Sequence, residues 1–148
     1  MFNVVLVEPE IPPNTGNIGR LCLATGSTLH LVKPLGFAID DRTLKRAGLD
    51  YWKEVEVRLW DSLEELLKSQ GEKSRLFLLT TKSGRAYYDV RFRPGDFLVF
   101  GRETKGLPEA VLAAHSERLL TIPMQGTRSL NLATAVAIVL FEAVRQQR

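Results

Sequence analysis

One short segment has the composition of a ligand-binding loop: FGRETKGLP, residues 100–108. It follows the apolar run DFLVF, and Gly101 and Gly106 have the G-x-x-x-x-G spacing of a phosphate-binding P-loop. A P-loop continues with Lys and Ser or Thr, which hold the phosphates and magnesium, whereas this chain continues with Leu107 and Pro108. The glycines still allow tight curvature and close approach by a ligand. A nucleoside triphosphate is therefore disfavoured as that ligand.

The charged side chains of this loop admit two interpretations. A plain strand–helix turn with solvated charges explains Arg102 and Lys105. It explains Glu103 less well, because this carboxylate stands on a turn that a flat ligand could approach.

The segment EPEIPPNT separates the first strand-like run from the helix-like run that follows. Its prolines end the first strand, and Asn14 or Thr15 can cap the following helix.

Two other segments place polar side chains after apolar runs. In GNIGR, Asn17 and Arg20 lie one turn apart, on the side of a predicted helix opposite its apolar stripe. A solvated arginine would explain Arg20, but its place just after a post-strand loop also suits binding. In IPMQGTRSLN, Ser129 or Asn131 caps the last helix, and this helix start is also a potential anion site.

The segment DDRTLKRAGLDYWK combines positive charges with aromatic rings. Arg42, Lys45 and Arg46 fall on one helical face, and Tyr51 and Trp52 follow at once. Basic side chains beside exposed rings suit a phosphate backbone and unstacked bases, so we predict an RNA-binding surface. The alternative is a solvated basic face with both rings packed inward.

Alternating strand-like and helix-like runs must position these residues. The predicted strands are Asn3–Val7, Thr28–Val32, Val55–Trp60, Arg75–Thr80, Asp96–Phe100 and Arg118–Ile122. The predicted helices are Asn17–Thr25, Asp41–Ala47, Ser62–Gln70, Pro108–Ala114 and Leu130–Gln147. The alternation predicts one α/β domain over residues 1–148, with a largely parallel sheet and helices on both faces. Ligands bind such sheets outside the carboxyl ends of the strands, where the polar loops fall.

The last helix is apolar on every side. Between Leu130 and Phe141 only Asn131 and Thr134 are not apolar. A helix packed on one sheet should keep a polar face, so this helix lies fully inside or covers a second subunit. In so short a chain we predict the second arrangement, a homodimer through the terminal helix.

Composition limits the alternatives. A net charge of +3 and a pI near 9.2 permit an anionic partner without requiring one. The single cysteine, Cys22, lies on an apolar stripe and is read as core. His30 and His115 have no partners at ligand spacing, so no metal site is expected. The chain has no signal-peptide pattern and no run long enough to span a membrane, which predicts a cytoplasmic protein.

Together, the polar segments resemble the motifs of the SPOUT superfamily of RNA methyltransferases, specifically its SpoU/TrmH-like 2'-O-methyltransferases. The three matches, in order, are Asn17-Ile18-Gly19-Arg20, then Gly101-x-Glu103-x-x-Gly106-Leu107, then Ile122-Pro123-Met124 with Ser129-Leu130-Asn131. EPEIPPNTGNIGRLC, LVKPLGF and RAGLDYW look most like the small TrmL-type enzymes. Those enzymes methylate the ribose 2'-hydroxyl of the wobble pyrimidine, position 34, of certain tRNAs.

The resemblance implies a deep trefoil knot in the C-terminal half, a homodimer through the terminal helix, and binding of the tRNA anticodon stem-loop. It also implies a pocket for S-adenosylmethionine. By matching positions, the pocket would use Leu79, Thr80, Gly101, Ile122, Met124, Ser129 and Leu130.

The resemblance casts Arg20 as the residue that activates the 2'-hydroxyl, in a reaction that needs no metal. A free arginine is a poor base because its pKa exceeds about 12. We therefore expect Arg20 to stabilise the developing alkoxide, with Asn17, Glu103, Ser129 and Asn131 orienting it and shaping the pocket. The rival functions are 2'-O-methylation elsewhere on tRNA or on rRNA, and a non-catalytic RNA-binding protein that holds the cofactor.

Overall fold

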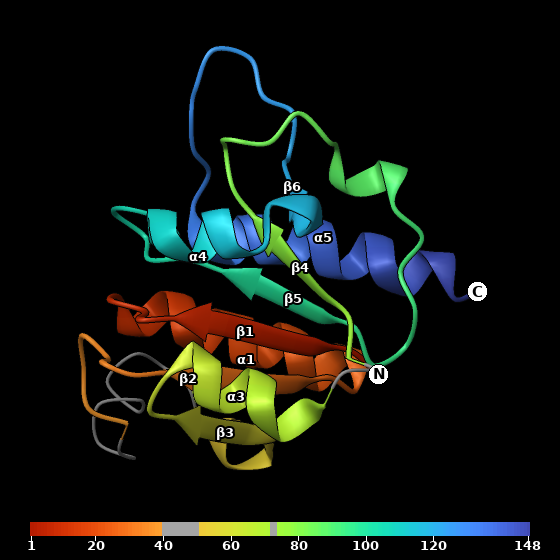
Figure 1. Ribbon diagram of the computed structural model, residues 1–148. Helices are drawn as coiled ribbons and strands as arrows, with labels where there is room; N and C mark the ends of the chain where they lie inside the picture. Colours follow the sequence, from red (N-terminus) through yellow and green to blue (C-terminus); the bar gives the residue numbers. More distant parts are fainter. Residues whose placement is uncertain (40–50, 72–73) are drawn as a thin grey trace.

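A computed structural model describes residues 1–39, 51–71 and 74–148. Its centre is a six-stranded sheet in the order β3-β2-β1-β5-β4-β6, and every pair of neighbouring strands is parallel (Figure 1). The strands are β1 (Asn3–Val7), β2 (Thr28–Val32), β3 (Val57–Trp60), β4 (Leu76–Leu79), β5 (Phe97–Phe100) and β6 (Leu119–Leu120). The α-helices are α1 (Pro12–Thr25), α3 (Leu63–Gln70), α4 (Glu109–Ala114) and α5 (Leu132–Gln146). The short 3-10 helices are η1 (Trp52–Glu54), η2 (Tyr87–Asp89) and η3 (Ser116–Arg118).

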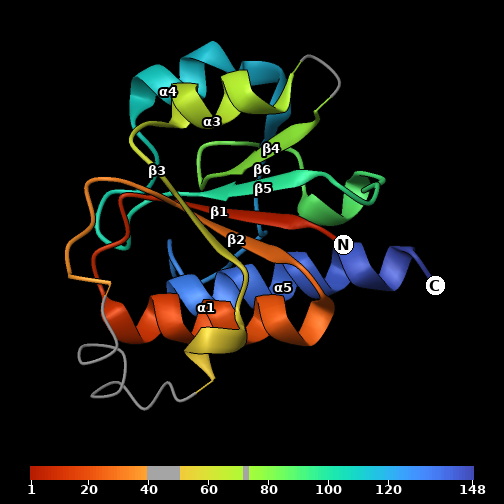
Figure 2. The same cartoon turned by 90° about the horizontal axis from the view of Figure 1, so that it is seen from below.

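Helices cover both faces of the sheet, as the alternating pattern predicts. Helices α1 and α5 lie on one face, and α3 and α4 lie on the other (Figure 2). Successive residues of a strand point to opposite faces, so β1 contributes to two cores. Val4 and Leu6 belong to the core under α1 and α5, whereas Val5 and Val7 belong to the core under α3 and α4. This double burial explains why β1 is an unbroken apolar run.

The structure corrects the start of α1. The helix begins at Pro12 rather than at the predicted Asn17. Proline fits the first helical turn, where its missing N–H would have no intrahelical partner. The N-cap is Ile11, whose side chain forms no capping bond, so neither Asn14 nor Thr15 caps the helix as expected.

The other elements keep their predicted type with small changes at the ends. β1 and β2 have the predicted bounds, and the remaining strands are shorter by one to two residues at one or both ends. The predicted helix Asp41–Ala47 lies outside the described residues.

Helix α5 is buried along one face only. It buries Leu132, Val136, Val139, Leu140 and Ala143. On the outer side Phe141 is 45% exposed. Of the two arrangements considered for this helix, full burial within one chain is therefore excluded. Among the described residues, no helix combines the length and apolarity that crossing a membrane requires.

His30 is a buried structural histidine. Its Nδ1 atom accepts a 2.9 Å hydrogen bond from Trp60 Nε1, which can only donate. Nε2 therefore carries the ring proton and donates to Asn3 Oδ1 at 2.9 Å. Burial, aided by the Arg58 charge, lowers the pKa of His30 from 6.5 to about 4. The His30 ring is therefore neutral in the folded protein above about pH 4.

This histidine should make stability depend on pH. In the unfolded chain the His30 ring is protonated below pH 6.5, whereas in the folded chain it is protonated only below about pH 4. The contribution of the neutral His30 to the free energy of unfolding should therefore be fully present above pH 6.5. The free energy of unfolding should fall by on the order of 3 kcal/mol as the pH drops to 4. Urea unfolding at several pH values would measure this loss. His30→Gln, which does not titrate, should show a shallower pH dependence, and equal slopes for the two proteins would contradict the assignment.

Candidate active site

Two loops at the carboxyl edge of the sheet hold each other through reciprocal hydrogen bonds. The Glu103 carboxylate, after β5, accepts the backbone N–H groups of Glu10 at 2.9 Å and Ile11 at 2.7 Å, just before α1. The Glu10 carboxylate accepts the Thr104 hydroxyl at 2.8 Å and its N–H at 3.1 Å. The Thr104 hydrogen bonds lower the pKa of Glu10 below its ordinary value. Each loop thus supplies the acceptor for the other.

Asn14 extends this connection to the last helix. Its Nδ2 atom lies 3.5 Å from Glu103 Oε2, and its Oδ1 atom accepts a 3.0 Å bond from Asn131 Nδ2. Asn131 in turn caps α5 by accepting the N–H of Thr134 at 3.2 Å. One chain of hydrogen bonds therefore joins all three polar segments.

Asn14, rather than Asn17, forms the hydrogen bonds that link the three segments. Asn17 is exposed and lies on the outer side of α1, whereas Asn14 is buried at 8% exposure. A sequence signal for this existed. With the prolines read as the start of α1, Asn14 falls four residues before Ile18, on the same face as this core residue.

The glycines of the β5 loop allow the loop backbone to fold closely back on itself. Arg102 and Gly106 exchange two backbone hydrogen bonds of 3.2 and 2.9 Å. A Cβ atom on Gly101 would lie 2.1 Å from the carbonyl carbon of Gly106, and Gly106 has a φ of +67°. The space at Gly101 is therefore filled by the chain's own backbone, which corrects the expectation that it admits a ligand.

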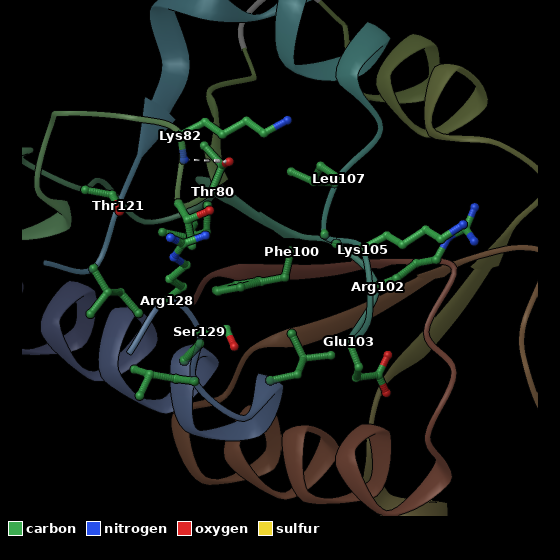
Figure 3. A pocket seen from close by; sticks show the side chains of 18 of the residues that line it. Thr80, Lys82, Phe100, Arg102, Glu103, Lys105, Leu107, Thr121, Arg128 and Ser129 are labelled. Carbon is green, nitrogen blue, oxygen red and sulfur yellow. Dashed lines mark hydrogen bonds between the residues drawn. The ribbon is translucent and has the colours of Figure 1, made fainter. Parts of the chain in front are cut away.

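A cavity of about 290 Å³ opens between the loops that follow β4, β5 and β6 (Figure 3). All seven residues predicted for the cofactor pocket line it: Leu79, Thr80, Gly101, Ile122, Met124, Ser129 and Leu130. Glu103 lines it as well, whereas Arg20, Asn17 and Asn131 do not. Phe100, Leu107 and Leu132 add apolar walls. Apolar walls with polar loop atoms at the rim suit a flat, partly polar ligand such as a nucleoside.

Arg20 lies on α1 and rests on an aromatic ring. Its guanidinium carbon is 4.9 Å from the centroid of the Tyr51 ring. The Tyr51 hydroxyl donates to the Gly16 carbonyl at 2.8 Å, which fixes the ring against α1. Burial raises the pKa of Tyr51, so the hydroxyl keeps the proton that it donates. The structure therefore holds Arg20 in place, but outside the cavity of its own chain.

The structure describes only the two aromatic residues of the predicted RNA-binding surface. Trp52 is 9% exposed, and its ring lies so close to Gly19 that a Cβ there would approach it to 2.7 Å. The prediction of an exposed ring is wrong for Trp52, because Gly19 makes room for it in the core. Tyr51 is half-buried. The three basic residues of this surface lie outside the described residues: Arg42, Lys45 and Arg46.

Two further predicted assignments concern metal ligands and the thiol. Over residues 1–39, 51–71 and 74–148, no cluster of three or more His, Cys, Asp or Glu side chains could hold a metal ion. Cys22 is fully buried, and burial raises the pKa of its thiol to about 12. It is core, as predicted, since a reactive cysteine needs an accessible thiolate.

Comparison with known proteins gives consistent matches along the whole chain. A protein of Polaromonas sp. (strain JS666), named tRNA (cytidine(34)-2'-O)-methyltransferase, is 54% identical over 99% of this chain and 91% of its own. A protein of the same name from Yersinia pestis is 49% identical over 99% of this chain and 94% of its own.

Solved structures also resemble the chain over nearly its whole length. One described as "Structural insights into the 2-OH methylation of C/U34 on tRNA" has a TM-score of 0.93 and 48% identity, covering 99% of this chain and 96% of its own. An AdoMet-bound rRNA methyltransferase from Sinorhizobium meliloti has a TM-score of 0.85 and 26% identity, covering 99% of this chain and 57% of its own.

The sequence profile of the SpoU rRNA Methylase family matches residues 1–141, nearly the full length. The resemblance drawn from the three polar segments is confirmed: the chain belongs to the SpoU rRNA Methylase family.

Proposed function

We propose that this protein transfers a methyl group from S-adenosylmethionine to the ribose 2'-hydroxyl of the wobble pyrimidine, position 34, of certain tRNAs. Relatives that are about half identical over nearly their whole length are named tRNA (cytidine(34)-2'-O)-methyltransferase, and a solved structure at 48% identity is described with methylation of C/U34 on tRNA. The observation that carries the proposal is structural. The loops after β5 and β6, which hold the second and third motif-like sequences, meet around one cavity, and a chain of hydrogen bonds joins both of them to the start of α1.

The residues of the cavity fit the proposed cofactor. The aliphatic side chains of Leu79, Ile122 and Leu130 can enclose a purine ring, and the loop backbone near Gly101 can meet its polar edge. When bound, the cofactor supplies a methyl group already activated by a sulfonium sulfur, so positioning provides much of the acceleration.

Arg20 has the charge that the reacting oxygen requires. The 2'-hydroxyl loses its proton during transfer, and Arg20 stabilises the alkoxide that develops. Glu103, Asn14 and Asn131 hold the start of α1 and of α5, and so fix the helix that carries Arg20. Ser129 shapes the cavity wall.

We also propose a homodimer in which Arg20 serves the cavity of the partner subunit. Arg20 is exposed and does not line the cavity of its own chain. Leu23, one turn further along α1, is 39% exposed, and Phe141 on α5 is 45% exposed. Both helices cover the same face of the sheet (Figure 2). Association over these apolar side chains would bury them and place Arg20 at the interface.

We also propose the trefoil knot, which the path of the chain around β6 supports. On one side the Thr80 N–H bonds the Leu120 carbonyl, in line with β4. On the other, Thr121 exchanges bonds with Arg85 and Tyr87, at 2.8 and 2.9 Å. Helix α4 before β6 and α5 after it cover opposite faces of the sheet (Figure 2). These contacts support a chain that passes through the loop of residues 80–96.

We also propose that residues 1–148 form one domain, because all the described strands belong to one sheet. A cytoplasmic location stays a prediction.

The function is tested by incubating the protein with unmodified tRNA and S-adenosylmethionine labelled in the methyl group. We expect label in tRNA, and nuclease mapping should place it on the ribose of nucleotide 34. Label at another nucleotide would refute the wobble assignment, and label in rRNA alone would favour the rival substrate. Cofactor binding without incorporation into any RNA would favour the non-catalytic protein.

Arg20→Ala should separate catalysis from cofactor binding. Removing a group that stabilises developing charge should slow methyl transfer by roughly 10²–10³-fold. Since Arg20 does not line the cavity of its own chain, affinity for S-adenosylhomocysteine should stay within about twofold, because the change removes no wall of the pocket. Arg58→Ala, an exposed arginine on β3, is the matched control. Near-normal turnover by Arg20→Ala would contradict the role.

Mixed dimers test whether Arg20 acts across the interface. Arg20→Ala can be co-expressed with Gly101→Ala, whose β5 loop cannot close. Random pairing makes half of the dimers mixed. If Arg20 acts on the partner subunit's cavity, each mixed dimer has one complete site of its two, so about a quarter of the wild-type activity should return. If the mixture is as inactive as its parents, Arg20 acts within its own chain.

A further inference from the structure

A second cavity adjoins the proposed cofactor pocket. Its volume is about 370 Å³, and it lies between the turn after β4 and the loop after β6. Both cavities share Thr81, Thr121 and Arg128. Arg128 extends from the loop after β6 into the first cavity, in the direction of Thr80 (Figure 3). The two cavities are therefore neighbouring compartments with Arg128 at their boundary.

The second compartment has the chemistry of an oxyanion site. Its polar side chains are four hydroxyls and one guanidinium: Thr81, Ser83, Thr121, Thr127 and Arg128. None of the described residues that line it is acidic. The hydroxyls of Ser83 and Thr127 donate to the carbonyls of Leu119 and Ser129, at 3.1 and 3.3 Å. The hydroxyls of Thr81 and Thr121 form no side-chain hydrogen bond within the described part of the chain. They can therefore donate to a ligand.

Arg128 has no neutralising partner among the described residues, unlike two of the other three cations that line the first cavity. Lys82 pairs with Glu109 at 3.0 Å, and Arg102 pairs with Glu8 at 3.2 Å. Arg128 forms no ion pair or side-chain hydrogen bond with any residue that the structure describes. Lys105 extends to the opposite side of the cavity from Arg128 (Figure 3).

An unpaired guanidinium is unfavourable beside the cofactor of the proposed function, because a sulfonium is itself a cation. Like charges in a partly enclosed site repel, unless an anion lies between them or beside one of them. An anionic group bound beside Arg128 would offset this repulsion. Guanidinium is well suited to this, since its planar N–H groups match a carboxylate or a phosphate.

We propose that Arg128, with Thr81 and Thr121, forms an oxyanion subsite beside the cofactor pocket. The inference rests on the proposed function, which supplies two sources of oxyanion. One is the carboxylate of the cofactor's amino-acid part, and the other is a phosphate of the RNA strand. Arg128 directly precedes Ser129, so an anion bound here also holds the loop that walls the first cavity.

Arg128→Gln tests the subsite by calorimetry with two ligands. S-adenosylhomocysteine has the amino-acid carboxylate, and 5'-methylthioadenosine has the same nucleoside and sulfur without it. If Arg128 binds the carboxylate, the variant should lose affinity for the first ligand by roughly tenfold or more and keep that for the second. If it binds a phosphate, both affinities should stay, the KM for tRNA should rise about tenfold, and the salt slope should fall by about one.

Two controls make the result specific. Arg128→Lys keeps the charge and should recover part of the loss, and Arg85→Gln removes an exposed arginine that lines neither cavity. Unchanged affinities together with an unchanged KM for tRNA in Arg128→Gln would overturn the subsite. Ligand binding is measured without methyl transfer, so a failure of the proposed function would appear separately, as a wild-type protein that binds S-adenosylhomocysteine but labels no RNA.

Discussion

The site depends on a single carboxylate that anchors a helix from another part of the chain. Helix α1 has no side-chain cap and no acidic residue in its first turn. Glu103 supplies a negative charge there instead, because its two oxygens accept the N–H groups of Glu10 and Ile11, directly before the helix. A negative charge at this end of a helix is also favoured by the helix dipole. The start of α1 is therefore held by the β5 loop as well as by its own prolines.

The same interaction makes the cavity a product of the whole fold. Glu103 and Ile11 are 92 residues apart in sequence, and Asn14 and Asn131 are 117 apart. Neither bond can form until β1 and β5 pair and α5 packs beside α1. Once formed, these bonds hold the loops in one arrangement before any ligand arrives, and such preorganisation lowers the free-energy cost of binding.

Local patterns in the sequence predicted the elements well where burial on both faces determines them. β1 and β2 match residue for residue, because both are buried parallel strands rich in Val and Leu. The start of α1 was misplaced because Pro12 was taken as the end of a strand instead of the first turn of a helix. Asn14 was then read as a cap, although it is the buried link between Glu103 and Asn131.

The cofactor pocket was predicted from a resemblance rather than from any local pattern. Ile122 and Leu130 look like ordinary core residues in sequence, and only the fold brings them to the cavity beside Gly101. Bonds between loops separated by some ninety residues have no local sequence signal, so the partners of Glu103 could not be named in advance. The burial of Trp52 against Gly19 was likewise one of two open alternatives until the packing was known.

The most direct test of this account is the affinity of Glu103→Gln for S-adenosylhomocysteine, measured by calorimetry. The control is Glu117→Gln, which changes an exposed glutamate that lines neither cavity. Glutamine leaves one of the two N–H groups without its charged acceptor, which costs roughly 1.5–3 kcal/mol. We expect the start of α1 and the β5 loop to separate and the affinity to fall about tenfold or more, while the control stays unchanged. Equal affinity in Glu103→Gln and the wild-type protein would show that the carboxylate does not organise the site.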